Sequence, residues 1–386
     1  MPLAAAAGGL YATPKSGASS KTRLRLVFLR GGYDANSLLI PVSSRFYYEA
    51  RPNIAIAPAG PDQNSALPLN TDWGLHPALR DSIYPLFNKG QVAFIPFAGT
   101  SDLSRSHFET QDGIELGQAL DRQRDYRSGF LNRLAATLND KDAISFTTQL
   151  PLVFQGHLQI PNTALRMISK RPLDPRQTSI IASMYQNTPL AQQVNEGFTV
   201  QDEVRRQMGT EMIAASRGAI TAKGFELEAR RVARLMRDKY NLGFVDVGGW
   251  DTHVGQGGAS GYLASRLEEL GRGLTAYVEE MGDNWHDTVV VVISEFGRTF
   301  RENGNRGTDH GHGSVYWVLG GGINGGRVLG EQIRLEQATL FQNRDMPILN
   351  EYRAVLGGLF GRLYGLNSTQ IERIFAGVKP TDIGII

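Results

Sequence analysis

The feature that most constrains this chain is the alternation of short, continuously apolar runs with amphipathic helical segments. Strands are expected at Leu24–Leu29, at Val92–Phe97 and at the start of residues 242–253, 287–299 and 314–326. Strands that are apolar along their whole length are typical of a parallel sheet covered on both faces. The pattern therefore predicts an α/β fold in which helices sandwich a mostly parallel sheet.

The composition narrows the classes of molecule that this chain is expected to bind. The 40 basic and 38 acidic residues give a formal net charge of +2 without a long basic run, which argues against nucleic-acid binding. No run reaches the roughly 18–20 apolar residues of a transmembrane segment. Cysteine is absent, so thiolate catalysis and cysteine-bound zinc are excluded. The expected partner is a small-molecule substrate, and the oligomeric state stays open.

The chain is expected to form one main domain, residues 23–386, after a leader at residues 1–22. The leader has small residues like the end of a secretory signal but lacks the basic region that precedes one. A disordered leader and a truncated export signal therefore both stay open. Residues from about 145 to 224 are more polar and rich in Gln and Arg, which predicts a helical insertion packed against the sheet.

Polar residues stand at the ends of the predicted strands, where ligands bind in open α/β sheets. They come from five segments: Asp34, Ser106, His107, Asp251, His253, Glu295, Asp309, His310 and His312. The most specific stretch is GTDHGHG, residues 307–313, which places an aspartate and two of the chain's 7 histidines between glycines. The pattern predicts one polar pocket at the edge of the sheet.

Carboxylates and imidazoles without thiols suit divalent ions of the zinc, manganese or calcium type. So many acids in one cleft would repel each other, and a cation removes that conflict. We expect two ions, about 3.5–4 Å apart, able to activate a nucleophile and bind the oxygens of a phosphoryl or sulfuryl group. The expected ligands are Asp34, Asp251, His253, Glu295, Asp309, His310 and His312.

Each candidate also has a structural interpretation. Asp34 follows two glycines and is as typical of a turn as of a metal ligand. Ser106 is either a nucleophile or a helix cap, and His107 either takes part in catalysis or packs against a neighbour. Glu295 ends an apolar strand, where an unpaired carboxylate is unfavourable, so it needs a metal or Arg298 as its partner. Three further histidines are expected to be structural: His76, His157 and His286.

Several stretches together resemble a bacterial family of uncharacterised proteins, domain of unknown function 1501, which is grouped with the sulfatase and alkaline-phosphatase superfamily. The stretches are LVFLRGGYDANSLLIP, GLHPAL, SHF, GGWDTH, SEFGRTFRENGNRGTDHGHG and YWVLGGGINGGRVLG, and they run from about residue 24 to 360. The resemblance implies an alkaline-phosphatase-like sheet with two metals at the strand ends and a Ser or Thr nucleophile. It implies fold more than activity, because function within the family is poorly defined.

Carried over by position, the resemblance implies a set of metal ligands in chain order: Asp34, Asp251, His253, Glu295, and His310 or His312. Ser106 matches the nucleophile, with three close competitors: Thr100, Ser101 and Ser104. The chain departs from the superfamily where Phe296 follows Glu295, since a histidine is usual there, and in the close spacing of Asp251 and His253. It also lacks the Cys/Ser-x-Pro-x-Arg motif of formylglycine sulfatases.

The resemblance also concerns location, because many family members begin with a twin-arginine export signal. No such arginine pair stands near the start of this chain. A periplasmic or exported location is expected from the family, and a cytoplasmic one is the alternative.

The functional hypothesis is a metal-dependent hydrolase of a phosphate ester, or of a sulfate ester as the second choice. The nucleophile is Ser106 or a metal-bound water, and His107 and Arg298 are the other candidate catalytic residues. The alternative is a non-catalytic binding or scaffold protein that retains the hydrolase fold.

Overall fold

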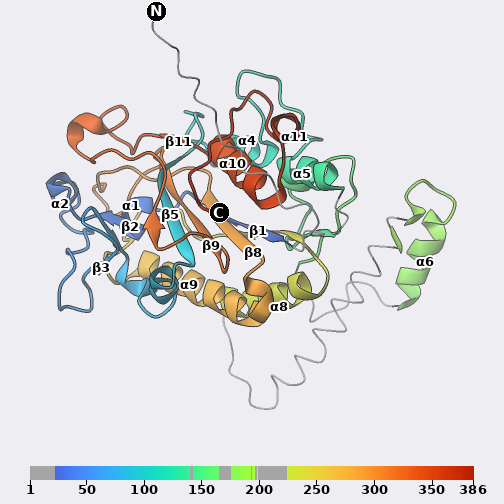
Figure 1. Ribbon diagram of the computed structural model, residues 1–386, viewed down its shortest axis with the longest axis horizontal. Helices are drawn as coiled ribbons and strands as arrows, with labels where there is room; N and C mark the ends of the chain where they lie inside the picture. The colour runs from blue at the N-terminus through green and yellow to red at the C-terminus, as the bar shows by residue number, and fades with distance from the viewer. Residues whose placement is uncertain (1–21, 140–141, 165–174, 193, 196–197, 199–223) are drawn as a thin grey trace, which may run out of the picture.

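The computed structural model describes residues 22–139, 142–164, 175–192, 194–195, 198 and 224–386. Its centre is an eight-stranded sheet in the order β10-β5-β9-β8-β1-β7-β6, with β11 paired to β5 beside this path (Figure 1). The long strands are β1 Arg23–Leu29, β5 Val92–Gly99, β7 Leu242–Val247, β8 Thr288–Ser294 and β9 Ser314–Gly320. The five expected strands are confirmed.

One strand runs against the rest of the sheet. β9 pairs antiparallel with both β5 and β8, whereas the pairs β1–β7, β1–β8 and β6–β7 are parallel. The start of β9 therefore lies at the edge where the parallel strands end. This direction decides where residues 307–313 lie, because they precede β9 and would lie at the opposite edge if that strand were parallel.

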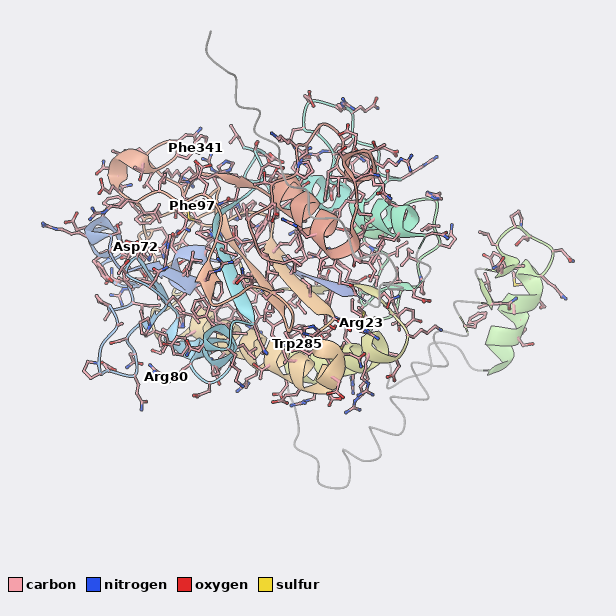
Figure 2. The ribbon with its side chains drawn as sticks, in the orientation of Figure 1. Arg23, Asp72, Arg80, Phe97, Trp285 and Phe341 are labelled. Carbon is pink, nitrogen blue, oxygen red and sulfur yellow. The ribbon has the colours of Figure 1, made fainter. Side chains whose placement is uncertain are left out.

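Helices cover both faces of the sheet, as expected for an α/β fold (Figures 1 and 2). Side chains of β1 alternate between the two layers: Val27 and Leu29 join one core cluster, Leu26 and Phe28 the other. The first cluster packs against α8 Phe225–Asp238 and α9 Tyr262–Met281. The second packs against three helices: α5 Phe130–Leu138, α10 Tyr352–Tyr364 and α11 Ser368–Ile374.

Shorter elements complete the described chain. A three-stranded sheet consists of β2 Leu39–Pro41, β3 Leu67–Pro68 and β4 Trp73–Leu75. The short helices are α1 Ala35–Leu38, α2 Arg45–Ala50 and α3 Ile83–Asn88, with the 3-10 turns η1 Pro77–Leu79, η2 Leu152–Phe154, η4 Gly282–Trp285 and η5 Gln337–Thr339. The remaining strands are β6 Ala143–Ser145, β10 Arg327–Val328 and β11 Asn350–Glu351.

The predicted helical insertion, residues 145–224, is described in part, since residues 165–174, 193, 196–197 and 199–223 lie outside the described residues. It includes η2 and the helix α6 Pro175–Tyr185, which stands to the side of the sheet in Figure 1 and exposes Ile180 and Met184. Packing of the insertion against the sheet, like the leader at residues 1–22, stays a prediction. Among the described residues, we find no helix whose length and apolar character would let it cross a membrane.

Candidate metal centre

Three histidines and one aspartate meet at the carboxyl edge of the sheet. His107 is the first residue of helix α4 (His107–Leu116), which follows β5. Asp251 and His253 follow β7, and His310 lies just before β9. The convergence of segments from distant parts of the chain at this edge agrees with the site position predicted for an open α/β sheet.

A buried carboxylate fixes the orientation of His107. Glu295 follows β8 and is 0% exposed, and its Oε1 accepts hydrogen bonds from His107 Nδ1, Gln111 Nε2 and the Gly31 amide, each at 2.8 Å. Burial opposes its charge, but the hydrogen bonds from His107 and Gln111 hold the pKa of Glu295 below its ordinary value. The Glu295 carboxylate therefore only accepts, so His107 Nδ1 carries a proton and Nε2 is left to face the site.

The other two imidazoles are fixed in the same way. His310 Nδ1 lies 3.0 Å from the carbonyl oxygen of Arg105, and His253 Nδ1 lies 3.1 Å from Asp309 Oδ1. Burial opposes the charge of Asp309, but hydrogen bonds from Asn303 and His253 keep its pKa below the ordinary value. Both acceptors lack a proton, so each histidine donates through Nδ1 and presents Nε2 to the centre.

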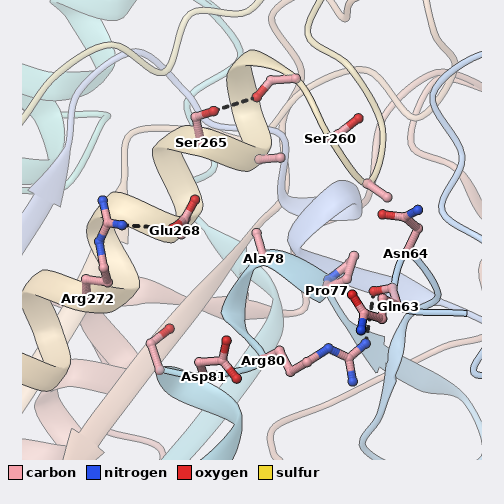
Figure 3. A pocket seen from close by; sticks show the side chains of 14 residues that line it. Gln63, Asn64, Pro77, Ala78, Arg80, Asp81, Ser260, Ser265, Glu268 and Arg272 are labelled. Atoms are coloured by element: carbon pink, nitrogen blue, oxygen red, sulfur yellow. Dashed lines mark hydrogen bonds and ion pairs between the residues drawn. The ribbon is translucent and has the colours of Figure 1, made fainter.

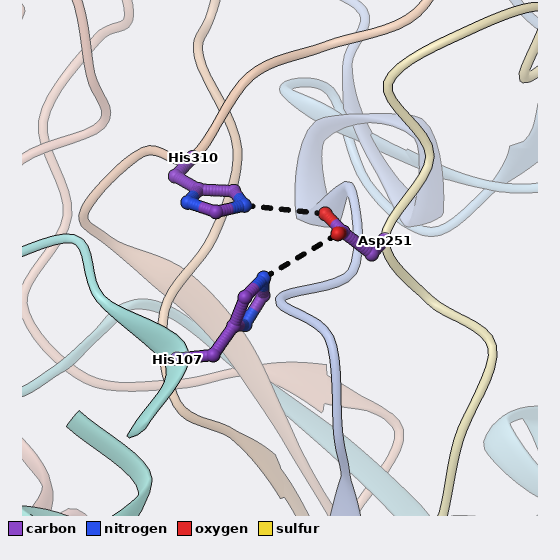
Figure 4. Close-up of side chains that lie close together, drawn as sticks. All are labelled: His107, Asp251 and His310. Carbon is purple, nitrogen blue, oxygen red and sulfur yellow. Dashed lines mark hydrogen bonds and ion pairs between the residues drawn. The ribbon is translucent and has the colours of Figure 1, made fainter. Parts of the chain in front are cut away.

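The three Nε2 atoms meet the Asp251 carboxylate. Asp251 Oδ1 lies 2.9 Å from His253 Nε2 and 3.3 Å from His310 Nε2, and its Oδ2 lies 3.5 Å from His107 Nε2. One ligand atom each from His107, Asp251 and His310 can be chosen so that all lie within 4.8 Å of one another (Figure 4). His253 adds a further imidazole that contacts two of these three groups.

The contact between His253 and His310 indicates a requirement for positive charge. Their Nε2 atoms are 3.1 Å apart, and each ring already uses its Nδ1 proton elsewhere. Two lone pairs at this distance repel each other unless a proton or a metal ion lies between them. The hydrogen bond to Glu295 raises the pKa of His107, whereas burial and the charge of His107 lower the pKa of His310.

Arg298 supplies a fixed positive charge beside this cluster. Its side chain is 0% exposed, and Nη2 lies 2.7 Å from Asp251 Oδ1 while Nη1 lies 3.4 Å from His253 Nε2. Burial opposes the charge of Asp251, but Arg298 is the main cause that lowers its pKa below the ordinary value. Burial also lowers the pKa of Arg298 itself.

Glycines allow the site segments to approach closely. Residues 297–299 pair with residues 309–312, with the Gly311 amide donating to the Gly297 carbonyl at 2.9 Å. A Cβ atom on Gly311 would lie 2.3 Å from the carbonyl carbon of Arg298, and one on Gly307 would lie 2.3 Å from the carbonyl oxygen of His253. These glycines of the GTDHGHG stretch are therefore needed to place His310 against His253.

Two predicted metal ligands lie away from this cluster. Asp34 is fully buried and its carboxylate binds Arg51 through both oxygens, at 2.5 and 3.0 Å, with further hydrogen bonds from Gln256 and Ser37. His312 packs against the Phe341 ring, with centroids 4.9 Å apart (Phe341 is labelled in Figure 2), and burial lowers its pKa to about 4. Neither residue joins the four converging groups, which corrects the set of expected ligands.

Two other expected ligands contact the histidines of the cluster but do not belong to it. Glu295 and Asp309 accept hydrogen bonds from the Nδ1 atoms of His107 and His253, so they orient these two imidazoles and do not join the cluster themselves. The partner of Glu295 is therefore His107, and neither of the two expected partners, a metal or Arg298. Carboxylates commonly hold metal-binding histidines in this way.

Ser106 occupies the N-cap position of α4. Its hydroxyl accepts from the Glu109 amide at 3.5 Å, and its own amide lies 3.3 Å from the Ser104 hydroxyl. The structural interpretation of Ser106 as a helix cap is thus present in the structure. His76, expected to be structural, is buried, accepts from the Ala78 amide through Nδ1 and donates to the Gly258 carbonyl through Nε2.

Several residues that shape the site were missed from the sequence. Gln111 lies four residues after His107, one turn along α4, and this spacing is the signal that both reach the same carboxylate. Arg51 neutralises Asp34 and lies 17 positions away with no motif connecting them. His310 is oriented by the backbone carbonyl of Arg105, and every residue has such a carbonyl, so the sequence carries no signal for this contact.

A polar pocket of about 480 Å³ lies elsewhere, between η1 and the start of α9 (Figure 3). Its arginines have partners of their own: Arg80 donates to the Gln63 carbonyl and Arg272 pairs with Glu268 at 2.8 Å. No histidine lines it. The pocket therefore lacks the converging ligand atoms of the histidine cluster.

Comparisons with known proteins place the chain in a family. No curated protein matches the sequence. A solved structure described as "Crystal structure of Ps i-CgsB in complex with k-i-k-neocarrahexaose" aligns with a TM-score of 0.38 and 10% identity over 94% of this chain and 75% of that chain, a likeness too low to argue from. The model of one family matches residues 21–375, almost the whole of the chain. The chain belongs to this family, which is described as protein of unknown function (DUF1501).

Proposed function

We propose that this protein is a metal-dependent hydrolase of a phosphate or related ester, with one divalent ion held by Asp251 and the imidazoles of His107, His253 and His310. The observation that carries the proposal is that three Nε2 atoms, each freed by a fixed Nδ1 hydrogen bond, lie 2.9–3.5 Å from one carboxylate, and that His107, Asp251 and His310 offer ligand atoms within 4.8 Å of one another. Orienting acceptors behind metal-binding histidines are the usual support of such sites.

The separations between the ligand atoms suit one small ion. Bonds of about 2.0–2.1 Å in a tetrahedral site place the ligand atoms roughly 3.3 Å apart. The contacts of Asp251 with the three imidazoles are 2.9, 3.3 and 3.5 Å, and the contact between His253 and His310 is 3.1 Å. Imidazole ligands favour zinc over calcium. This set supports one ion in place of the two expected from the sequence.

The residues around the ligands would bind an anionic substrate and keep the ligands in position. Glu295, Asp309 and the Arg105 carbonyl hold the imidazoles, so that little reorganisation is needed when ligands bind. Arg298 adds a positive charge on one side, which favours a negatively charged ester. A bound divalent ion would supply Lewis-acid activation of the nucleophile and charge for the developing oxyanion.

Water is the proposed nucleophile. The Ser106 hydroxyl already accepts from the Glu109 amide as the cap of α4. Neither Glu295 nor His107 makes a hydrogen bond to Ser106, so the hydroxyl has no base beside it among the described contacts of these two residues. We also propose that the sheet and its site are related to those of the alkaline phosphatases, as the family resemblance implies.

The experiment is a screen of aryl phosphates, phosphodiesters and aryl sulfates with added zinc, manganese or calcium. Asp251→Asn should abolish turnover, whereas Ser106→Ala should retain it within a few fold. Asp62→Asn, at an exposed loop position, serves as the control. A well-folded protein that binds the ion but turns over none of these esters would favour the alternative of a binding or scaffold protein. Turnover lost in Ser106→Ala would show that the hydroxyl is the nucleophile.

A further inference from the structure

Arg298 is a buried cation with unused hydrogen-bonding capacity. The side chain is 0% exposed, Nε has no hydrogen-bond partner among the described residues, and Nη2 has only its ion pair with Asp251. These two nitrogens form one edge of the guanidinium group, the edge that binds carboxylates and phosphates through two parallel hydrogen bonds. A buried donor without an acceptor is unfavourable, so this edge suits a ligand that supplies acceptors.

Asp251 is the group that balances the charge of Arg298. Its Oδ1 lies 2.7 Å from Nη2 in an ion pair. The same oxygen lies 2.9 Å from His253 Nε2 and 3.3 Å from His310 Nε2. One carboxylate oxygen therefore faces both the guanidinium and the imidazoles that would hold an ion, and the two cations compete for it.

We propose that Arg298 is the receptor for a tetrahedral oxyanion, and that this anion and the metal ion bind cooperatively. The inference rests on the proposed function. Once Asp251 is bound to an ion, Arg298 loses its counter-ion and lies beside a second positive charge. An anion placed between the two cations restores the balance, and Asp251, which is 45% exposed, has room to turn away from Arg298.

A tetrahedral anion fits this arrangement better than a carboxylate. Phosphate or sulfate offers two oxygens to the Nε–Nη2 edge and keeps another for the cation beside it, whereas a carboxylate has only two oxygens in all. The effect must be reciprocal: if the anion strengthens metal binding by some factor, the metal strengthens anion binding by the same factor. The substrate class is therefore an ester with a tetrahedral oxyanion centre.

The test is a titration of the full chain with Mn²⁺, in which electron paramagnetic resonance measures the free ion. Titrations in saturating inorganic phosphate are compared with titrations in acetate at equal ionic strength. The expected result is a rise in Mn²⁺ affinity of about tenfold in phosphate, within the range typical of coupled sites. Arg298→Lys, which keeps the charge but loses the planar edge, should lose most of this rise.

Arg301→Lys is the matched control, because Arg301 lies three residues further along and its guanidinium stacks over Phe46, 4.8 Å from the ring centre. It should keep the full effect of phosphate. Mn²⁺ binding that is equal in phosphate and acetate would overturn this inference and leave the proposed function standing. A wild-type protein that binds neither Mn²⁺ nor Zn²⁺ in either buffer would overturn both. The wild-type comparison requires no variant to fold.

Discussion

Two aspartate–arginine pairs lie at the same edge of the sheet, and they differ in how completely they are satisfied. Asp34 and Arg51 are both 0% exposed, and every Arg51 nitrogen donates: Nε to the Phe300 carbonyl, Nη2 to Asp34 and the Thr299 carbonyl, and Nη1 to Asp34. In the second pair, Asp251 is 45% exposed, and Arg298 leaves Nε without a partner among the described residues and Nη2 with the ion pair to Asp251 alone.

The difference separates a structural ion pair from a candidate functional one. A pair whose acceptors and donors are all used has no capacity left for a ligand, and its charges are matched to each other. A pair with unused donors, an exposed carboxylate and three imidazoles around it can exchange its internal contacts for contacts with an ion or substrate. We call them the closed pair, Asp34–Arg51, and the open pair, Asp251–Arg298.

The largest expected difference between the pairs is in stability. Arg51→Met leaves a buried, unpaired Asp34 carboxylate and should lower the free energy of unfolding by about 3–5 kcal/mol. The matched change Arg298→Met leaves Asp251 in contact with water and removes the buried Nε donor that has no acceptor, so it should alter that free energy by about 1 kcal/mol or less. Urea unfolding of both variants measures the difference. Equal losses would show that the two pairs are structurally equivalent.

Acid should destabilise the folded protein through His76. Burial lowers the pKa of His76 to about 4, so the unfolded chain binds a proton there below about pH 6.5 while the folded protein does not. Stability is full above pH 6.5 and falls by about 3 kcal/mol as the pH drops to 4. His76→Asn, which keeps an acceptor for the Ala78 amide, should flatten this part of the curve. An unchanged slope in the variant would contradict the assignment.

Metal affinity should depend on the residues that orient the site histidines through hydrogen bonds. Glu295→Gln replaces the acceptor of His107 Nδ1 with an uncharged one and should weaken zinc binding by about 10–100-fold. Gln111→Ala, which removes another hydrogen bond to the same oxygen but keeps the carboxylate, is the milder comparison. Calorimetric titration with zinc gives both values. Wild-type affinity in Glu295→Gln would mean that His107 needs no orienting carboxylate.

The smallest expected effect is at Ser106. Ser106→Ala removes the cap of α4 and should cost about 1 kcal/mol of stability, with zinc affinity unchanged. Ser106→Asn, which retains a capping side chain, should recover most of the loss. Thermal unfolding and zinc titration of the same samples provide the two readings, and a clear loss of zinc affinity would place Ser106 among the ligands.

The hydrophobic pattern predicted the strands because continuously apolar runs such as those of β1 and β8 are buried on both faces. It did not predict the direction of β9, since burial is the same for parallel and antiparallel strands. The position of His310 depends on that direction. The sequence thus indicated which segments meet, and the sheet topology explains how residues before a strand reach the same edge as residues after the others.

The sequence predicted only part of the site, because the rest depends on side-chain positions that spacing does not determine. Asp251 and His253 are close in sequence and do lie together, with 2.9 Å between His253 Nε2 and Asp251 Oδ1. Whether Glu295 is a ligand or the acceptor behind one depends on a shift of a few ångströms, which residue type and spacing do not encode. Asp34 is not among the converging groups because its charge is paired with that of Arg51, a residue that no sequence motif connects to it.

The most direct test of the account is anomalous diffraction from a crystal soaked in a zinc salt. The account predicts one strong zinc peak at about 2.0–2.2 Å from Asp251 and the Nε2 atoms of the site histidines, and no peak at Asp34. Absence of a peak at Asp251 in fully soaked crystals, or a peak at Asp34 or His312 instead, would contradict it.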